Sequence, residues 1–177
     1  MGLFDCSALD PYADKDVHWL LRSQAARRSD APFLIWEPFS GAGETWSYAR
    51  FYADARNVAA GLRARGIGHG DFLLLHANNC PEFLLTWYAC AMLGAVVVTT
   101  NPRAAVGEMA YFIEHSAVKA AVVEHGYLEL LAQTGAQLDW IAAIPTAESG
   151  DAQLPDGILP FTSLRADGAV LERPSLD

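Results

Sequence analysis

Cysteine is scarce in this sequence of 177 residues. The three cysteines, Cys6, Cys80 and Cys90, are odd in number and form no C-x-x-C pair. Their spacing suggests neither a disulfide framework nor a zinc knuckle. Because free thiols persist in a reducing compartment, we expect a cytoplasmic protein.

Positive charge is also limited. The sequence has 12 Lys and Arg residues against 21 Asp and Glu residues, which gives a net charge of −9 at pH 7. A surface that binds nucleic acid needs the opposite sign to neutralise backbone phosphates. We therefore expect no nucleic-acid partner.

No segment has the length and uniformity of a membrane span. Residues 83–98 carry no charge, but Gly94 interrupts them, and the helix-compatible FLLTWYACAML gives way to the β-branched VVVTT. Because a transmembrane helix needs about 20 consecutive apolar residues, a buried helix followed by a buried strand is favoured. The acidic start of the sequence does not resemble a secretory signal.

Common motifs for phosphate, nucleophile and metal chemistry are absent too. The sequence contains no G-x-x-x-x-G-K-[ST], no G-x-S-x-G and no H-E-x-x-H. Gly66, Gly68 and Gly70 follow an expected helix and precede an expected strand, the reverse of the order in a dinucleotide loop, so they predict a tight turn. His125 and Glu129 are four residues apart without a third ligand, which favours a solvated pair over a metal site. We assign no catalytic residue and no metal ligand.

The sequence does contain apolar segments at regular intervals. Hydrophobic residues make up 52% of the chain, enough for a buried core. Apolar segments at 72–77, 95–100, 119–124 and 140–145 alternate with stretches of helical periodicity. Apolar runs without polar alternation are typical of parallel strands covered on both faces, and the helices between them imply right-handed crossovers.

Two amphipathic helices and a hairpin are expected before these alternating segments. We expect a helix over 14–28 capped by Asp14 or Asp16, a hairpin that joins FLIWEP to ETWS, and a helix that follows Ser47. The expected fold is α/β, with a mostly parallel sheet of about four strands, flanking helices and a short β-hairpin. We assign residues 1–145 to this α/β subdomain. Residues 146–177 are expected to form an acidic, Pro- and Gly-containing connector, in which only LPFTSL (159–164) could form a short turn or helix.

Polar residues cluster where two of the expected strands end. His76, Asn78 and Asn79 follow one strand, and Thr99-Thr-Asn-Pro-Arg103 follows the next. Ligands of parallel α/β sheets gather at such carboxyl ends, near the free N–H groups of helix N-termini. In the simpler interpretation the Asn residues turn and cap the chain, and His76 is part-buried with its hydrogen bonds satisfied. Arg103 is then a surface cation, and the alternative is that Arg103 pairs with a phosphate. Three nearby aromatic residues are expected in a helix core rather than in a substrate pocket: Phe83, Trp87 and Tyr88.

The order of these segments resembles the N-terminal part of the adenylate-forming acyl-CoA synthetases, the AMP-binding family. The matching stretches are TWSYARFYADARNVAAGLRARGIGHGD, LLHANNCPEF, LLTWYACAMLGAVVVTTNPR and VGEMAYFIEHSAVKAAVV. The likeness covers about residues 17–123 and continues more weakly to residue 164. The NNCPEF segment is most similar to acyl-CoA and carnitine-CoA ligases.

This resemblance implies a two-step reaction. Enzymes of the family join a carboxylic acid to ATP, which gives an acyl-adenylate and pyrophosphate, and the thiol of coenzyme A then displaces AMP. The resemblance implies ATP, Mg and coenzyme A as cofactors and a carboxylic acid as substrate. It also implies that the coenzyme A nucleotide lies near the turn at 100–103 and the loop around His125, so Asn101 and Arg103 are the expected cofactor contacts.

Several functional parts of that family are missing. The Ser/Thr/Gly-rich phosphate loop, the acidic residue for the ribose and the C-terminal lysine do not occur in this sequence. We therefore expect a piece of a longer ligase, inactive by itself and binding no cofactor tightly, with the rest of its own chain as its partner. A face left bare by that remainder would favour self-association. The alternative is a stand-alone, non-catalytic scaffold or partner-binding module of the same fold.

One departure from the family concerns a helix cap. Ala104 and Ala105 stand where the family commonly has a capping Thr, just before the helix that contains Glu108. Loss of a side-chain cap costs about 1 kcal/mol. We expect this helix to begin without one.

Overall fold

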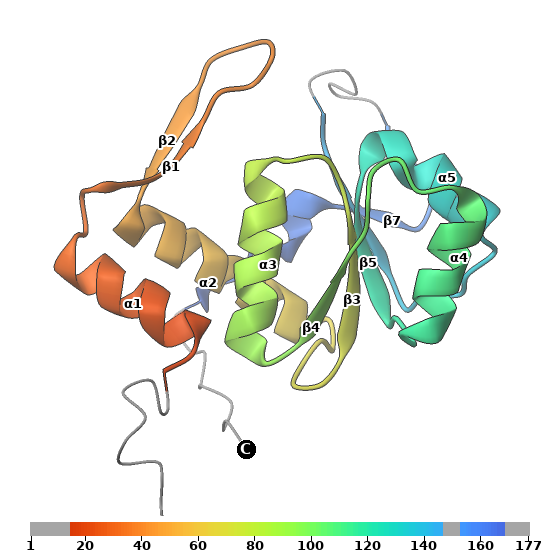
Figure 1. The fold of residues 1–177 in the computed structure, drawn as a ribbon, viewed down its shortest axis with the longest axis horizontal. Helices are drawn as coiled ribbons and strands as arrows, with labels where there is room; N and C mark the ends of the chain where they lie inside the picture. The colour runs from red at the N-terminus through yellow and green to blue at the C-terminus, as the bar shows by residue number, and fades with distance from the viewer. Residues whose placement is uncertain (1–14, 147–152, 169–177) are drawn as a thin grey trace, which may run out of the picture.

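The computed structural model describes residues 15–146 and 153–168, so Cys6 and the expected cap Asp14 lie outside the described residues. Figure 1 shows a twisted sheet between two groups of helices, with a hairpin that projects beyond them. The elements in chain order are α1 (Val17–Arg27), β1 (Pro32–Trp36), β2 (Glu44–Ser47), α2 (Tyr48–Ala64), β3 (Phe72–His76), α3 (Pro81–Leu93), β4 (Val96–Thr99), α4 (Val106–His115), β5 (Ala120–Glu124), the 3₁₀ turn η2 (His125–Tyr127), α5 (Leu128–Gln133), β6 (Ile141–Ile144), β7 (Ile158–Pro160) and the 3₁₀ turn η3 (Phe161–Leu164).

The main sheet is parallel and has five strands in the order β4-β3-β5-β6-β7. This confirms the α/β class and the parallel topology. The apolar sequence of the central strands follows from their burial, because Leu73, Leu74 and Leu75 of β3 are all fully buried. The antiparallel pair β1–β2 is the expected hairpin, and Ile35 and Phe39 on it are exposed.

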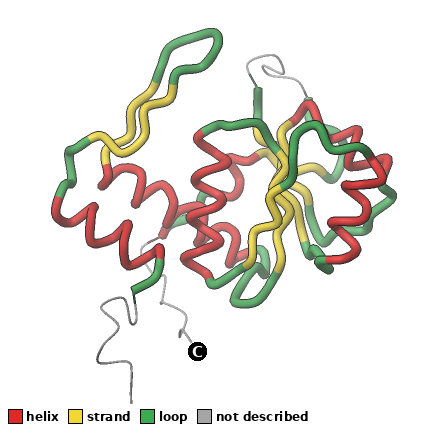
Figure 2. The backbone as a smooth tube through the Cα atoms, viewed as in Figure 1, coloured by secondary structure: helices red, strands yellow, loops and turns green. Residues whose placement is uncertain are grey.

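The two faces of the sheet are covered by different helices, as the tube in Figure 2 shows. On one face α2 and α3 pack against Leu73 and Leu75, together with Phe161 and Leu164 of η3. On the other face α4 and α5 pack around Leu74. None of the helices in the described part of the chain is long and apolar enough to span a bilayer.

The sheet has five strands, one more than the expected number of about four. The fifth strand, β7, lies in the stretch that we expected to be a connector, where it pairs with β6 at the edge of the sheet. Three residues are too few to show a periodic pattern, and Pro160 lowers the strand propensity, although an edge strand tolerates its missing N–H. The short turn expected at 159–164 is confirmed as η3, in which Phe161 and Leu164 are buried.

Local capping follows the sequence. The side chain of Asp16 accepts a hydrogen bond from the backbone N–H of Trp19 and begins α1. Ser47 does the same for α2, with its Oγ 3.2 Å from the backbone nitrogen of Arg50. Each bond satisfies an N–H group that the first turn of a helix leaves unpaired.

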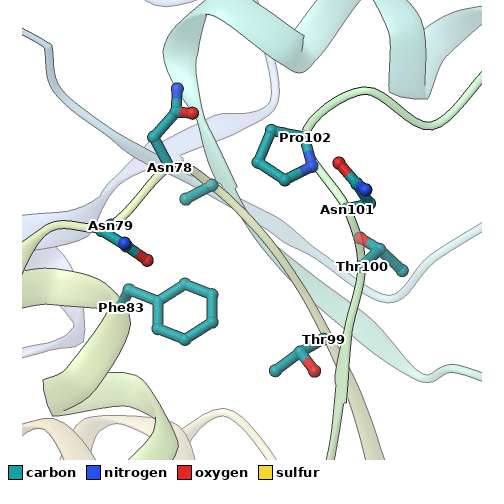
Figure 3. A pocket seen from close by; sticks show the side chains of 8 residues that line it. Asn78, Asn79, Phe83, Thr99, Thr100, Asn101 and Pro102 are labelled. Carbon is teal, nitrogen blue, oxygen red and sulfur yellow. The ribbon is translucent and has the colours of Figure 1, made fainter.

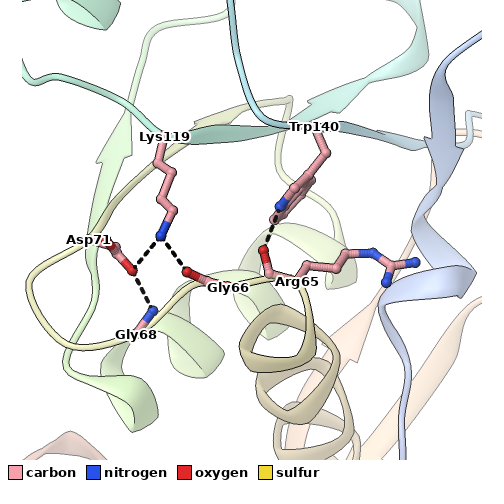
Figure 4. Close-up of polar contacts among 6 residues, drawn as sticks. All are labelled: Arg65, Gly66, Gly68, Asp71, Lys119 and Trp140. Atoms are coloured by element: carbon pink, nitrogen blue, oxygen red, sulfur yellow. Dashed lines mark hydrogen bonds and ion pairs between the residues drawn. The ribbon is translucent and has the colours of Figure 1, made fainter.

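The glycine segment 66–70 is a turn, as expected, and it anchors the amino edge of the sheet (Figure 4). Gly66 and Gly70 have φ values of 83° and 76°, which glycine adopts without strain. The Asp71 carboxylate accepts bonds from the Gly68 N–H at 2.8 Å and from Lys119 Nζ at 3.2 Å. The Gly68 bond, with help from Lys119, lowers the pKa of Asp71 against the opposing effect of burial. This cluster ties the start of β3 to the start of β5.

Candidate functional site

The carboxyl edge of the sheet, which is the side at which the parallel strands end, has a crevice between β3 and β4. Helix α3 leaves β3 toward one face of the sheet, whereas α4 leaves β4 toward the other face. Ligands of parallel sheets bind where neighbouring connections diverge in this way. The chain topology therefore creates an opening here without any special motif.

A cavity of about 440 Å³ occupies this crevice. Figure 3 shows its two walls: Asn78, Asn79 and Phe83 come from the end of β3 and from α3, and the turn after β4 lies opposite. The complete lining is Ala77, Asn78, Asn79, Phe83, Thr99, Thr100, Asn101 and Pro102. The lining combines amides and hydroxyls with one aromatic ring, which suits a polar molecule with a planar part.

A second cavity of about 250 Å³ adjoins the first. The two share Thr99, Thr100 and Asn101, and the second adds Arg103, Ala104, Glu108 and Phe112. The structure thus brings the two predicted contact residues together, because both Asn101 and Arg103 line this cavity. The Asn101 Oδ1 accepts a hydrogen bond from the backbone N–H of Arg103 at 2.9 Å, and the side chain of Arg103 is exposed. In the part of the chain that the structure describes, no ion pair occupies its guanidinium group.

Helix α4 begins beside this cavity with Ala105 as its N-cap, and no side chain caps it. This confirms the expectation that the helix begins without a side-chain cap. Glu108 provides partial compensation, since its Oε2 accepts a hydrogen bond from the Ala105 N–H at 2.9 Å. The first turn of α4 therefore keeps N–H groups without helical partners, and its positive end favours anions.

Asn78 does not cap α3, contrary to the simpler interpretation. Its backbone N–H and its Nδ2 donate to the Glu124 carboxylate, and Nδ2 also lies 2.9 Å from the Tyr127 hydroxyl. The N-cap of α3 is Cys80, which makes no side-chain cap. Asn78 instead links the end of β3 to the end of β5. Neither Glu124 nor Tyr127 was identified from the sequence, although both follow the same strand-end rule that pointed to Asn78.

His76 also differs from expectation. It is fully buried rather than part-buried, and its Nε2 has no hydrogen-bond partner among the described residues. Its Nδ1 lies 2.7 Å from Thr100 Oγ1. Burial lowers the pKa of His76, and nearby Glu124 opposes this shift. The imidazole is therefore held in its neutral form.

The three aromatic residues of α3 have different environments. Tyr88 is partly buried against the core, where its ring meets the rings of Phe33 and Phe51. Trp87 is 36% exposed, so its placement in the core is wrong. Phe83 packs against the core and also lines the first cavity. One helix turn separates Phe83 from Trp87, so the periodicity alone could not distinguish them.

Other candidate chemical groups are structural. Burial raises the pKa values of the Cys80 and Cys90 thiols to about 12, so these two thiols stay protonated at neutral pH. Glu129 accepts a hydrogen bond from Gln133 Nε2. Within residues 15–146 and 153–168, no group of three or more His, Cys, Asp and Glu side chains could hold a metal ion.

Comparison with known proteins identifies a consistent set of relatives. The family model described as "AMP-binding enzyme" matches residues 21–165. The chain is 32% identical over 162 residues to 4-coumarate–CoA ligase 2 of Oryza sativa subsp. japonica, a match that covers 85% of this chain and 27% of that protein. It is 32% identical over 141 residues to a crotonobetaine/carnitine–CoA ligase of Salmonella heidelberg (strain SL476), covering 77% of this chain and 26% of the relative.

A solved structure shows the same fold. The acetoacetyl-CoA synthetase of Streptomyces lividans superimposes with a TM-score of 0.79 at 19% identity, over 91% of this chain and 26% of the synthetase. The chain thus spans about a quarter of the length of the relatives that it matches.

Proposed function

This chain belongs to the AMP-binding enzyme family, and from that premise we propose that it forms the N-terminal part of an ATP-dependent acyl-CoA ligase. The complete reaction would convert a carboxylic acid, ATP and coenzyme A into an acyl-CoA, AMP and pyrophosphate. The names of the two curated relatives, both CoA ligases, support this activity. Because the chain covers only about a quarter of their length, we assign to it only part of this ligase activity.

The part that this chain would play is to provide a contact surface for coenzyme A. The supporting observation is the second cavity, in which Asn101 and Arg103 lie beside the uncapped start of α4. Coenzyme A carries several phosphate charges on its nucleotide end. A guanidinium group, hydroxyls and free helical N–H groups are the donors that phosphate prefers. Glu108 lines the same cavity, but its carboxylate is engaged with the Ala105 N–H.

We propose that the described residues do not provide the groups that would hold ATP and magnesium. No cluster of metal-ligating side chains lies within them, and the sequence contains no lysine-bearing phosphate loop. We propose that these groups, and most of the acid-binding pocket, belong to the remainder of a longer enzyme. The present chain would then provide the scaffold and one wall of the coenzyme A site, and would bind none of the cofactors tightly.

The remainder would also cover surfaces that are apolar in this chain. Ile35 and Phe39 of the hairpin are 63% and 113% exposed. Apolar side chains left bare in this way promote association between copies. We propose that this chain self-associates in solution, and light scattering should report a mass above that of a monomer.

Titration of the ¹⁵N-labelled chain with coenzyme A tests the contact surface. We expect the amide signals of Thr100, Asn101 and Arg103 to shift, with a dissociation constant on the order of 1 mM. The amides of Gly68 and Asp71, at the opposite edge of the sheet, serve as the internal control and should not move. Shifts centred on the amino edge, or no shifts at all, would refute the proposed contact surface.

A further inference from the structure

The buried imidazole of His76 makes a hydrogen bond that reaches the cavities. His76 ends β3, where it is fully buried, and the next residue, Ala77, is also buried. The rings of His76 and Tyr127 form a T-shaped pair, at a centroid distance of 4.7 Å and an interplanar angle of 72°. A polar ring enclosed in this way is costly unless its bonds are made, yet Nε2 has no partner among the described residues. The ring therefore depends on the polar contact that its other nitrogen makes.

That contact is with Thr100. Nδ1 lies 2.7 Å from Thr100 Oγ1, and Thr100 belongs to the lining shared by both cavities. The backbone of Thr100 is fixed as well, because its N–H donates to the Leu75 carbonyl at 3.3 Å. A threonine hydroxyl can rotate to suit several partners, so the bond from His76 selects one orientation.

The position of the proton follows from the same contacts. Burial lowers the pKa of His76, so the ring is neutral and carries a single N–H. A proton on Nε2 would be a buried donor without an acceptor, which proteins avoid more strictly than an unused acceptor. We therefore assign the proton to Nδ1, so that this nitrogen donates to Thr100 Oγ1. The hydroxyl hydrogen of Thr100 is then left for another acceptor.

We propose that His76 is a positioning residue, which fixes the Thr100 hydroxyl as a hydrogen-bond donor to coenzyme A at the carboxyl edge of the sheet. This inference rests on the proposed function, since that function provides the ligand. His76 itself touches no ligand and acts through Thr100. The acceptor that matches a fixed hydroxyl beside Arg103 is a phosphate oxygen of the nucleotide.

A double-mutant cycle tests this role. His76→Leu removes the imidazole bond, Thr100→Val removes the hydroxyl at nearly constant shape, and His76→Asn keeps a side-chain donor near the position of Nδ1. Each single loss should weaken coenzyme A binding by about five-fold, the effect of one typical hydrogen bond. The double variant should bind no more weakly than either single variant, because both changes remove the same interaction. His76→Asn should restore affinity to within about two-fold of the parent chain.

The orientation of Thr100 provides a second measurement that needs no ligand. Three-bond coupling constants should show a single χ1 rotamer for Thr100 in the parent chain and an average over rotamers in His76→Leu. If His76→Leu does not fold, the comparison of His76→Asn with Thr100→Val remains. Parent-like affinity and a fixed Thr100 in His76→Leu, or additive losses in the double variant, would overturn the inference alone. A parent chain that shows no coenzyme A shifts at the carboxyl edge would overturn the proposed function, and this inference with it.

Discussion

Replacing Gly61 with alanine should lower the free energy of unfolding of this chain by about 3 kcal/mol or more. A β-carbon at this position of α2 would lie 1.6 Å from the carbonyl oxygen of Leu164 and 2.3 Å from its carbonyl carbon. Because these are backbone atoms, no side-chain rotation relieves the clash. The turn η3 would have to move away from α2, which would expose Phe161 and Leu164, now 2% and 0% exposed. Urea unfolding monitored by circular dichroism measures the loss.

Gly107 provides the matched control. It lies in the first turn of α4 and is exposed. Apart from its chain neighbours and the backbone of its own helix, a β-carbon added there would meet no atom within 4 Å. Gly107→Ala should leave stability unchanged or raise it by up to about 1 kcal/mol, since alanine favours helix. Equal, small effects of the two substitutions would show that residues 161–164 do not pack against α2 as described.

Arg103→Gln should weaken binding of coenzyme A by about ten-fold at low ionic strength. The substitution keeps a polar, shorter side chain and removes the one cationic group among the residues that line the two cavities. Charge-assisted bonds to phosphate are about twice as strong as neutral bonds. The difference between parent and variant should shrink as salt is added, because Arg103 is exposed. Titration followed by NMR or calorimetry measures both effects.

Arg63→Gln makes the same change in net charge at the other edge of the sheet. Arg63 lies in the last turn of α2, before the turn that leads into β3, and it is exposed. Its replacement should change the affinity by less than about two-fold. If both substitutions weakened binding equally, the attraction would reflect overall charge rather than a site at Arg103.

Much of the fold could be predicted from local patterns. The apolar runs that became β3, β5 and β6 are buried from both sides, and that environment removes polar alternation from a strand. The edge strand β4 is apolar as well, although its residues are partly buried or exposed. The N-caps Asp16 and Ser47 act within one helical turn, so their signal lies in adjacent residues. Gly66 and Gly70 could be assigned to a turn because the elements on either side fixed the order of helix and strand.

Features that depend on distant contacts could not be predicted in this way. Gly61 is a small residue inside a helix pattern, and only the packing of Leu164 explains it. The strand β7 forms because its three residues pair with β6, and these residues show almost no periodic pattern by themselves.

The candidate site was predictable to a similar degree. The strand-end rule placed Asn101 and Arg103 at the carboxyl edge, where both now line one cavity. The bonds from Asn78 to Glu124 and from His76 to Thr100 depend on the register between β3 and its two neighbours, which no local pattern contains. The simpler interpretation therefore failed for Asn78 and His76.

We propose that this chain contributes a scaffold and a coenzyme A contact, while the adenylating centre requires residues outside it. The most direct test is ATP–pyrophosphate exchange by the 177-residue chain with magnesium and a panel of carboxylic acids, with a full-length acyl-CoA ligase assayed alongside. We predict exchange at the level of the buffer control for every acid. Acid-dependent exchange well above that level, catalysed by this chain alone, would contradict the claim.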